Sequence, residues 1–205
     1  MVKQNTNTQK ELKVPFNFKV RNKGCALACV EMIMSYYHQN IDVDKIYKSL
    51  AMSNDGLDLF EVASELSRIG YQINGGFTDE DITFGVKNHV ELINDKILKK
   101  IDKNLVEAYK GILMTMDKNK NIKIHRLVLR DIKESIDKNE PIIINLLSKG
   151  KNEFMHSVCV IGYNENDIVI LNPPKIGKEY IQMETFFNLH QESGGYYFSI
   201  KRRSI

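Results

Sequence analysis

Cys25 and His156 are the residues whose types and surroundings could do chemistry in this sequence. Cys25 begins an amphipathic stretch, Gly24-Cys-Ala-Leu-Ala-Cys-Val-Glu-Met-Ile-Met-Ser-Tyr-Tyr37, so we expect its thiol in the first turn of a helix. The positive end of the helix dipole lowers the pKa of a thiol placed there, which populates the nucleophilic thiolate near neutral pH. A nearby histidine completes a nucleophile and base pair, so the sequence predicts an enzyme that carries an acyl group on Cys25.

Asn172 is the expected third member of this group. His156 begins a strand pattern, and because alternate residues of a strand share a face, Cys159 points away from His156. A turn at residues 163–166 and a second strand return the chain to Asn172. An amide oxygen there can accept a hydrogen bond from one imidazole nitrogen and leave the other facing Cys25. A thiolate-imidazolium pair needs orientation more than added basicity, so asparagine is acceptable in this position.

Helical patterns fill the first part of the chain, and strand patterns fill the last part. Apolar residues recur at three- and four-residue steps from about Cys25 to His38, which predicts a helix with one buried face. Further helices are expected at residues 44–52, 58–68 and 131–138. The expected β segments are a hairpin-like stretch at 71–76 and strands at 141–147, 155–162, 167–171 and 195–201. Helices followed by antiparallel strands predict an α+β fold, with the nucleophile helix packed on a twisted sheet.

A helical insertion is expected at about residues 77–127. Ile93, Ile97, Ile101 and Leu105 recur every four residues, which is typical of one or two amphipathic helices. Two roles stay open for this segment: it closes over a substrate, or it thickens the core.

Length and composition bound the class of protein. At 205 residues and 42% hydrophobic content the chain can bury a core, and we expect a flexible arm over 1–12 and a single domain over 13–205. No apolar run reaches the length of about 18 residues that a membrane span needs. Three cysteines do not make a disulfide framework, which favours a cytoplasmic protein. The net charge of +3 and the mixed charges do not indicate a nucleic-acid or membrane partner. The histidines lack ligand spacing, so no metal or other cofactor is expected.

Five segments give the sequence a family resemblance: residues 24–32, 156–162, 167–173, 184–186 and 194–198. The first resembles the nucleophile helix of the papain-like bacteriocin-processing peptidases, the double-glycine leader peptidases, whose motif runs Cys-Gly-x-Ala before an apolar helix. The next two are similar to their His-x-Val-Val segment and the Asp-Pro that ends the following strand, and the last two to their final helix and closing strand. The resemblance implies a papain-like fold with Cys25, His156 and Asn172 as catalytic residues.

The sequence departs from the family pattern at Ala26, Asn172 and Lys19. The family has glycine after the nucleophile and aspartate as the third catalytic residue. Lys19 stands six residues before Cys25, where the family has a glutamine whose amide donates into the oxyanion hole. Asn17 and Asn22 are candidate substitutes for this glutamine, and the backbone N–H of Cys25 is a further donor. Loss of one donor of this kind typically reduces transition-state stabilisation by about 3 kcal/mol.

The sequence leaves three functions open. The first is an amide-forming acyltransferase in which Cys25 takes an acyl group from a thioester, for example one bound to an acyl-carrier protein, and passes it to an amine acceptor. A thioester needs less oxyanion stabilisation than an amide, which fits Lys19, and free-standing amide-forming enzymes of thiotemplated, polythioamide-type biosynthesis look similar in size and layout. The second is a peptidase that cleaves a leader or other peptide through Cys25 and His156. The third is an inactive relative that binds peptides.

Overall fold

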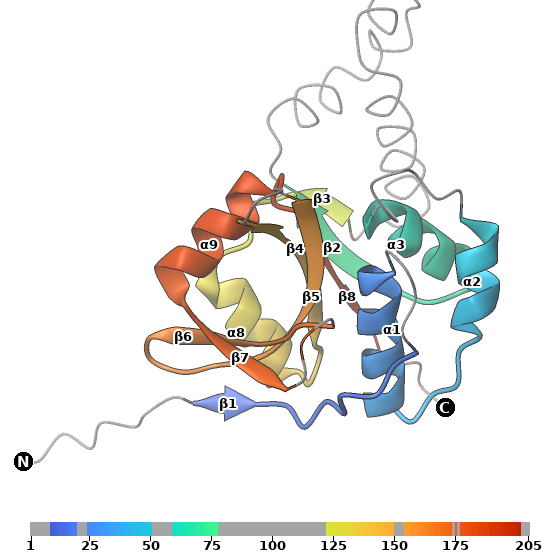
Figure 1. The fold of residues 1–205 in the computed structure, drawn as a ribbon, viewed down its shortest axis with the longest axis horizontal. Helices are drawn as coiled ribbons and strands as arrows, with labels where there is room; N and C mark the ends of the chain where they lie inside the picture. Colours follow the sequence, from blue (N-terminus) through green and yellow to red (C-terminus); the bar gives the residue numbers. More distant parts are fainter. Residues whose placement is uncertain are drawn as a thin grey trace, which may run out of the picture.

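A computed structural model describes residues 9–19, 24–50, 59–77, 122–149, 154–173, 175 and 177–201. Within these ranges one twisted sheet runs through the molecule, with α1, α2 and α3 on one side and α8 and α9 on the other (Figure 1). The helices are α1 (Cys25–Tyr36), α2 (Val43–Ser49), α3 (Leu59–Arg68), α8 (Leu129–Asp137) and α9 (Met183–Glu192). The predicted α+β fold is confirmed.

The sheet contains most of the strands that the sequence predicts and some that it does not. The strands are β1 (Lys10–Glu11), β2 (Ile73–Phe77), β3 (Ile122–Ile124), β4 (Ile142–Ser148), β5 (Phe154–Tyr163), β6 (Asp167–Leu171), β7 (Lys178–Gln182) and β8 (Tyr197–Ile200). Their order is β3-β2-β8-β4-β5-β6-β7, and β1 pairs with β5 outside this path. Among the described pairs, β2 with β3 is parallel and the rest are antiparallel.

The helix α1 forms the centre of the core. It packs against β4 and β5 on one side and against α2 and α3 on the other. Its residues from Ala26 to Val30 are all buried, because neighbours cover the helix around its circumference. The helix ends at Tyr36, slightly before the predicted end at His38, where a backbone φ of 55° takes the chain out of the right-handed helical region. Burial of each large apolar side chain contributes about 1.5–3 kcal/mol, so α1 is anchored firmly.

Two other helices differ slightly from their predicted limits. α2 begins at Val43 because the Asp42 carboxylate accepts a hydrogen bond from the Lys45 amide at 2.9 Å, and it ends at Ser49 because Leu50 is extended. α8 begins before Asp131, because the carboxylate of this residue reaches back to accept from the Val128 amide at 2.9 Å. Among the described residues, no helix is both long enough and apolar enough to cross a membrane.

The hairpin-like segment predicted at 71–76 is wrong, because β2 is a single strand between β3 and β8. A Cβ atom at Gly75 would clash with the Tyr197 carbonyl oxygen of the neighbouring strand β8. Glycine is therefore needed for the close approach of β8 and not for a turn. The predicted insertion at 77–127 falls mostly outside the described residues. Where it is described, Phe77 ends β2, Ile122–Ile124 forms β3, and 125–127 is not helical.

The arm predicted over residues 1–12 is wrong at its end. Lys10 and Glu11 pair with Tyr163 and Gly162 of β5, and Leu12 is buried at 4% exposure. A Cβ atom at Gly162 would lie 2.5 Å from the Lys10 carbonyl oxygen, so this glycine permits the pairing. Residues 1–8 lie outside the described part of the chain.

Candidate active site

The structure brings Cys25, His156 and Asn172 together. The Nε2 atom of His156 lies 2.6 Å from Oδ1 of Asn172. An amide oxygen only accepts, so Nε2 carries the hydrogen and donates it, which leaves Nδ1 for the thiol. The imidazole makes this second hydrogen bond to Cys25. The three side chains thus form a connected chain from the helix to the end of β6.

The pairing of β5 with β6 explains why Asn172 reaches His156. β6 ends at Leu171, which pairs with Cys159 of β5. If this register is continued one residue past the end of β6, Asn172 falls opposite Val158, and opposed side chains of an antiparallel pair lie on the same face. Because alternate residues of a strand share a face, His156 lies on this face as well. The alternation predicted from the sequence is the reason that these two side chains meet.

The thiol of Cys25 lies in the first turn of α1, where positive charge is concentrated. Gly24 is the N-cap, no side chain caps the helix, and its first turn contains no acidic residue. The Ser157 backbone N–H donates to the Cys25 sulfur at 3.4 Å. Burial alone would raise the pKa of this thiol, but the hydrogen bond and charge of His156 and the bonds from Ser157 outweigh burial and lower the pKa of Cys25 to about 7. About half of the thiol is therefore ionised at pH 7.

The same contacts act on His156 in the opposite sense. Burial disfavours the imidazolium, but the hydrogen bond and charge of Cys25, the bond to Asn172 and the charge of Glu179 raise the pKa of His156 above its ordinary value. A raised imidazole pKa and a lowered thiol pKa together favour the thiolate-imidazolium pair near neutral pH. This is the ionisation state in which sulfur attacks a carbonyl carbon.

Behind Cys25, a buried polar network fixes Ser157. The Ser157 hydroxyl donates to the side-chain oxygen Oδ1 of Asn145 at 2.8 Å. The backbone carbonyl oxygen of Asn145 accepts from His190 Nδ1 at 3.0 Å and from the Ser193 hydroxyl at 2.8 Å. Burial lowers the pKa of His190 to about 4, so this imidazole is neutral at pH 7. This network is not among the features predicted from the sequence. Its signal was Asn145 itself, a polar residue within an apolar strand, since a buried amide requires hydrogen-bond partners.

Lys19, the candidate oxyanion residue at the family's glutamine position, makes its hydrogen bonds away from the thiol. The Lys19 amide donates to the Glu31 carboxylate at 2.9 Å, and the Lys19 ammonium pairs with Asp44 of α2 at 2.8 Å. Glu31 lies six residues along α1 from the thiol, which corresponds to about 9 Å of helix. Asn17 is exposed, and Asn22 lies outside the described residues.

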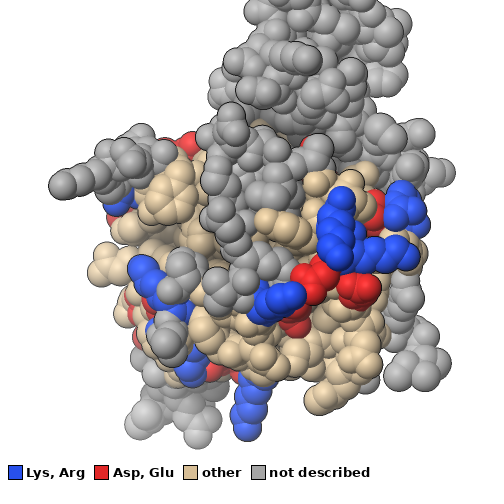
Figure 2. All heavy atoms as spheres, turned by 45° about the vertical axis from the view of Figure 1, so that its right-hand side comes forward, with Lys and Arg blue, Asp and Glu red and all other residues tan. Residues whose placement is uncertain are grey.

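The surface around α1, α2 and α3 mixes charges of both signs. In Figure 2, Lys and Arg side chains on the described part of this face lie directly beside Asp and Glu side chains. One such pair joins Lys19 to Asp44, and another joins Arg68 to Glu65 at 2.6 Å. Exposed ion pairs of this kind contribute little to stability. Lys19 is thus part of a paired, solvated surface.

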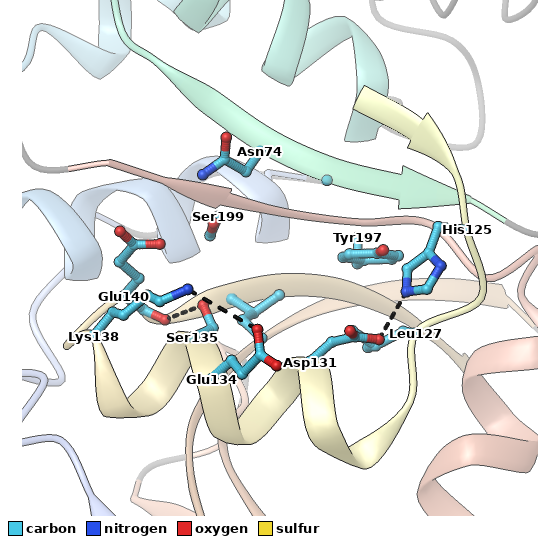
Figure 3. A pocket seen from close by; sticks show the side chains of 12 residues that line it. Asn74, His125, Leu127, Asp131, Glu134, Ser135, Lys138, Glu140, Tyr197 and Ser199 are labelled. Carbon is cyan, nitrogen blue, oxygen red and sulfur yellow. Dashed lines mark hydrogen bonds and ion pairs between the residues drawn. The ribbon is translucent and has the colours of Figure 1, made fainter. Parts of the chain in front are cut away.

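A cavity of about 350 Å³ lies elsewhere, between α8 and the strands β2 and β8 (Figure 3). Carboxylates and hydroxyls line it, and Figure 3 shows His125 and Asp131 paired at its rim. The lining residues are Asn74, Gly75, His125, Leu127, Asp131, Glu134, Ser135, Lys138, Glu140, Ile142, Tyr197 and Ser199. Cys25, His156 and Asn172 are not among them, so the cavity is separate from the thiol site. Among the described ranges, no three His, Cys, Asp or Glu side chains are arranged to hold a metal ion.

Several solved structures share the fold, among them the following three. A protein described as a C39-like peptidase from Bacillus anthracis matches with a TM-score of 0.57 and 12% identity, covering 97% of this chain and 100% of that one. A double glycine motif protease from an AMS/PCAT transporter matches with a TM-score of 0.51 and 16% identity, covering 95% of this chain and 97% of that one. The peptidase domain of Streptococcus ComA, a bi-functional ABC transporter, matches with a TM-score of 0.50 and 12% identity, covering 90% of this chain and 96% of that one.

The sequence itself also identifies the family. Among curated proteins none matches the chain. A family model, described as the Peptidase_C39 like family, matches residues 3–198. The papain-like fold predicted from the sequence, and its resemblance to the double-glycine peptidases, are confirmed by this match and by the shared fold. The chain therefore belongs to the Peptidase_C39 like family.

Proposed function

We propose that this protein is a cysteine peptidase whose nucleophile is Cys25. The observation that carries the proposal is the connected group of Cys25, His156 and Asn172, in which the thiol pKa is lowered to about 7. The thiolate adds to the carbonyl carbon of a peptide bond. His156 gives its proton to the leaving amine as the C–N bond breaks, and an acyl-thioester remains on Cys25. His156 then removes a proton from water, which attacks the thioester and releases the acid and the free thiol.

The oxyanion of this reaction needs hydrogen-bond donors near the thiol. The first N–H groups of a helix have no partner within the helix, so the Cys25 backbone N–H is the donor that we propose. The uncapped start of α1 favours negative charge at the same place. Lys19 does not add a second donor, because its ammonium is paired with Asp44 and its amide bonds to Glu31.

A peptide is the proposed substrate. Phe154 lies two residues before His156 on the same face of β5, is 55% exposed, and has its ring 6.1 Å from the His156 ring between centroids. A large apolar side chain exposed beside a nucleophile can bind an apolar side chain of a peptide. The related double glycine motif protease was solved in complex with a leader peptide, which supports a peptide as the class to test first.

Acyl transfer to an amine is the second candidate. The observation that favours it is Lys19, which stands at the family's glutamine position and places its ammonium on Asp44. A thioester donor, such as an acyl group on a carrier protein, is more reactive than an amide and depends less on the oxyanion hole. The acyl group would move from the donor sulfur to Cys25, and an amine would replace water as the second nucleophile.

Intact-protein mass measurements separate these functions. Wild type, Cys25→Ala and the control Cys159→Ala are mixed with a panel of peptides that includes Gly-Gly sequences, and separately with a simple acyl thioester before and after addition of a diamine. Cleavage that Cys25→Ala abolishes and Cys159→Ala retains supports the peptidase. An acyl adduct that the diamine converts into an amide, without peptide cleavage, supports the acyltransferase. Absence of both, with Cys25 inert to alkylation at pH 6, would leave only a peptide-binding relative.

A further inference from the structure

The strand register places a second carboxylate on the face that carries His156. On β7, Glu179 pairs with Ile170 of β6, and Ile170 pairs in turn with Val160 of β5. Opposed residues share a face, so Glu179 lies on the same face as Val160 and therefore as His156. Asn172 lies two residues beyond Ile170. Glu179 and Asn172 are thus diagonal neighbours, which brings their Cα atoms to about 7–8 Å in a regular sheet.

One oxygen of the Glu179 carboxylate lacks a hydrogen-bond partner among the described residues. Oε2 accepts from the Lys175 ammonium at 3.0 Å, whereas Oε1 is fully buried and makes no hydrogen bond among the described residues. A buried carboxylate oxygen without a hydrogen bond is unfavourable unless a positive charge stabilises it. The Lys175 ammonium stabilises one side of the carboxylate. The other charge that Glu179 acts on is the imidazolium of His156.

We propose that Glu179 is a positioning residue for His156 and supplies the negative charge that Asn172, as a neutral amide, cannot. Asn172 orients the ring through its hydrogen bond, and Glu179 stabilises the positive charge on the ring once the thiolate has formed. The two roles that one aspartate combines are here divided between a residue just after β6 and a residue on β7. The inference rests on the proposed function, because the imidazolium matters only if Cys25 acts as a nucleophile.

The charges around His156 determine whether a substitution should stabilise or destabilise the imidazolium. Cys25 faces the ring from α1, Glu179 acts on it from β7, and Lys175 opposes Glu179 from the turn between β6 and β7. Removing the Glu179 charge should weaken the imidazolium and with it the thiolate. Removing the Lys175 charge should strengthen both, because the field of Glu179 on the ring is then no longer partly neutralised.

The test is the pH dependence of Cys25 alkylation by iodoacetamide in wild type, Glu179→Gln and the control Glu184→Gln, an exposed carboxylate on α9. Glu179→Gln should raise the half-point of the alkylation profile by about 0.5–1 pH unit, so that the rate at pH 6 falls about 3- to 10-fold while the rate at pH 9 is unchanged. Glu184→Gln should keep the wild-type profile. Asn172→Asp in the Glu179→Gln background should restore reactivity at pH 6, because it returns a carboxylate to the ring.

Lys175→Gln should change the alkylation rate in the direction opposite to Glu179→Gln. It tests the role of Glu179 even if Glu179→Gln does not fold. Its alkylation rate at pH 6 should rise. An unchanged profile in Glu179→Gln or in Lys175→Gln, with wild-type Cys25 still reactive at pH 6, would overturn the role of Glu179 and leave the proposed function standing. A wild-type Cys25 that is inert at pH 6 would overturn the proposed function itself.

Discussion

Cys25 and Cys29 lie one turn apart on α1, yet the protein gives their thiols opposite properties. The pKa of Cys25 is lowered to about 7, whereas burial and the nearby Cys159 and Cys25 thiols raise the pKa of Cys29 well above its ordinary value. Cys29 is fully buried, and Cys25 is not. The type of residue and the helix are the same in both cases. The difference must therefore come from the groups that face each sulfur.

Ser157 shows how one residue serves both thiols. Its backbone N–H donates to the Cys25 sulfur at 3.4 Å, and its carbonyl oxygen accepts from the Cys29 sulfur at 3.7 Å. A donor stabilises a thiolate, and an acceptor stabilises a protonated thiol. The strand β5 thus presents a donor to the first turn of α1 and an acceptor to the second. His156 and this alignment of β5 account for the opposite pKa shifts of the two thiols, together with the deeper burial of Cys29.

Replacement of the two cysteines should give the largest contrast. Cys25→Ala should abolish cleavage or acyl transfer, with a loss of at least about 10⁴-fold in kcat, because the covalent intermediate cannot form. Cys29→Ala should keep kcat within a few fold and lower the free energy of unfolding by about 1 kcal/mol, because it removes only a buried packing group. Steady-state kinetics and urea unfolding measure the two effects. Substantial activity in Cys25→Ala would refute the proposed mechanism.

The comparison also predicts a pH profile that depends on His156. With a Cys25 pKa of about 7, alkylation of wild type should reach half of its maximal rate near pH 7 and about a tenth of it at pH 6. Loss of His156 removes the main interactions that oppose burial, so in His156→Ala the thiol pKa should rise toward its ordinary value. The rate at pH 6 should then fall about 100-fold. His125→Ala, on the cavity by α8, is the control and should keep the wild-type profile. A half-point near pH 7 in His156→Ala would mean that the helix terminus alone ionises the thiol.

Asn172→Ala should have an intermediate effect. The ring of His156 would lose the acceptor at 2.6 Å that fixes its orientation, while Cys25 would keep its helix terminus and the Ser157 N–H. We expect kcat to fall about 10- to 100-fold, less than for removal of a general base. Asn166→Ala, in the exposed turn before β6, is the matched control and should retain kcat. Equal kcat values for the two variants would show that Asn172 does not position the ring.

The sequence predicted the parts of the site that depend on periodicity. The start of α1 at Cys25 and the alternation along β5 follow from side-chain patterns, and they are sufficient to bring His156 and Asn172 onto one face. The strand β7 was missed, although its alternation of exposed and half-buried residues carries a weak signal in the sequence. Without β7 the sequence could not place Glu179 near His156.

Contacts that depend on the backbone or on tertiary packing had no usable signal. Gly75 reads as a turn because turns and close strand approaches both select glycine. The Lys19 ion pair requires the packing of α2 beside α1, which no local pattern specifies. The donor and acceptor of Ser157 are backbone atoms that every non-proline residue has, so the sequence does not show their function.

Among these variants, Ser157→Ala should have the smallest effect on the reactivity of Cys25. It separates the side chain of Ser157 from the backbone atoms that face Cys25 and Cys29. The variant keeps the backbone N–H and carbonyl that face the two cysteines, but it removes the hydroxyl that donates to Asn145. The buried Asn145 oxygen then lacks this partner, so the free energy of unfolding should fall by about 1–3 kcal/mol in urea unfolding. The hydroxyl makes the smallest of the contributions that lower the Cys25 pKa, so the alkylation half-point should rise by less than about one pH unit. A larger rise would show that the hydroxyl controls the thiol, whereas the expected result assigns that control to His156 and the Ser157 backbone N–H.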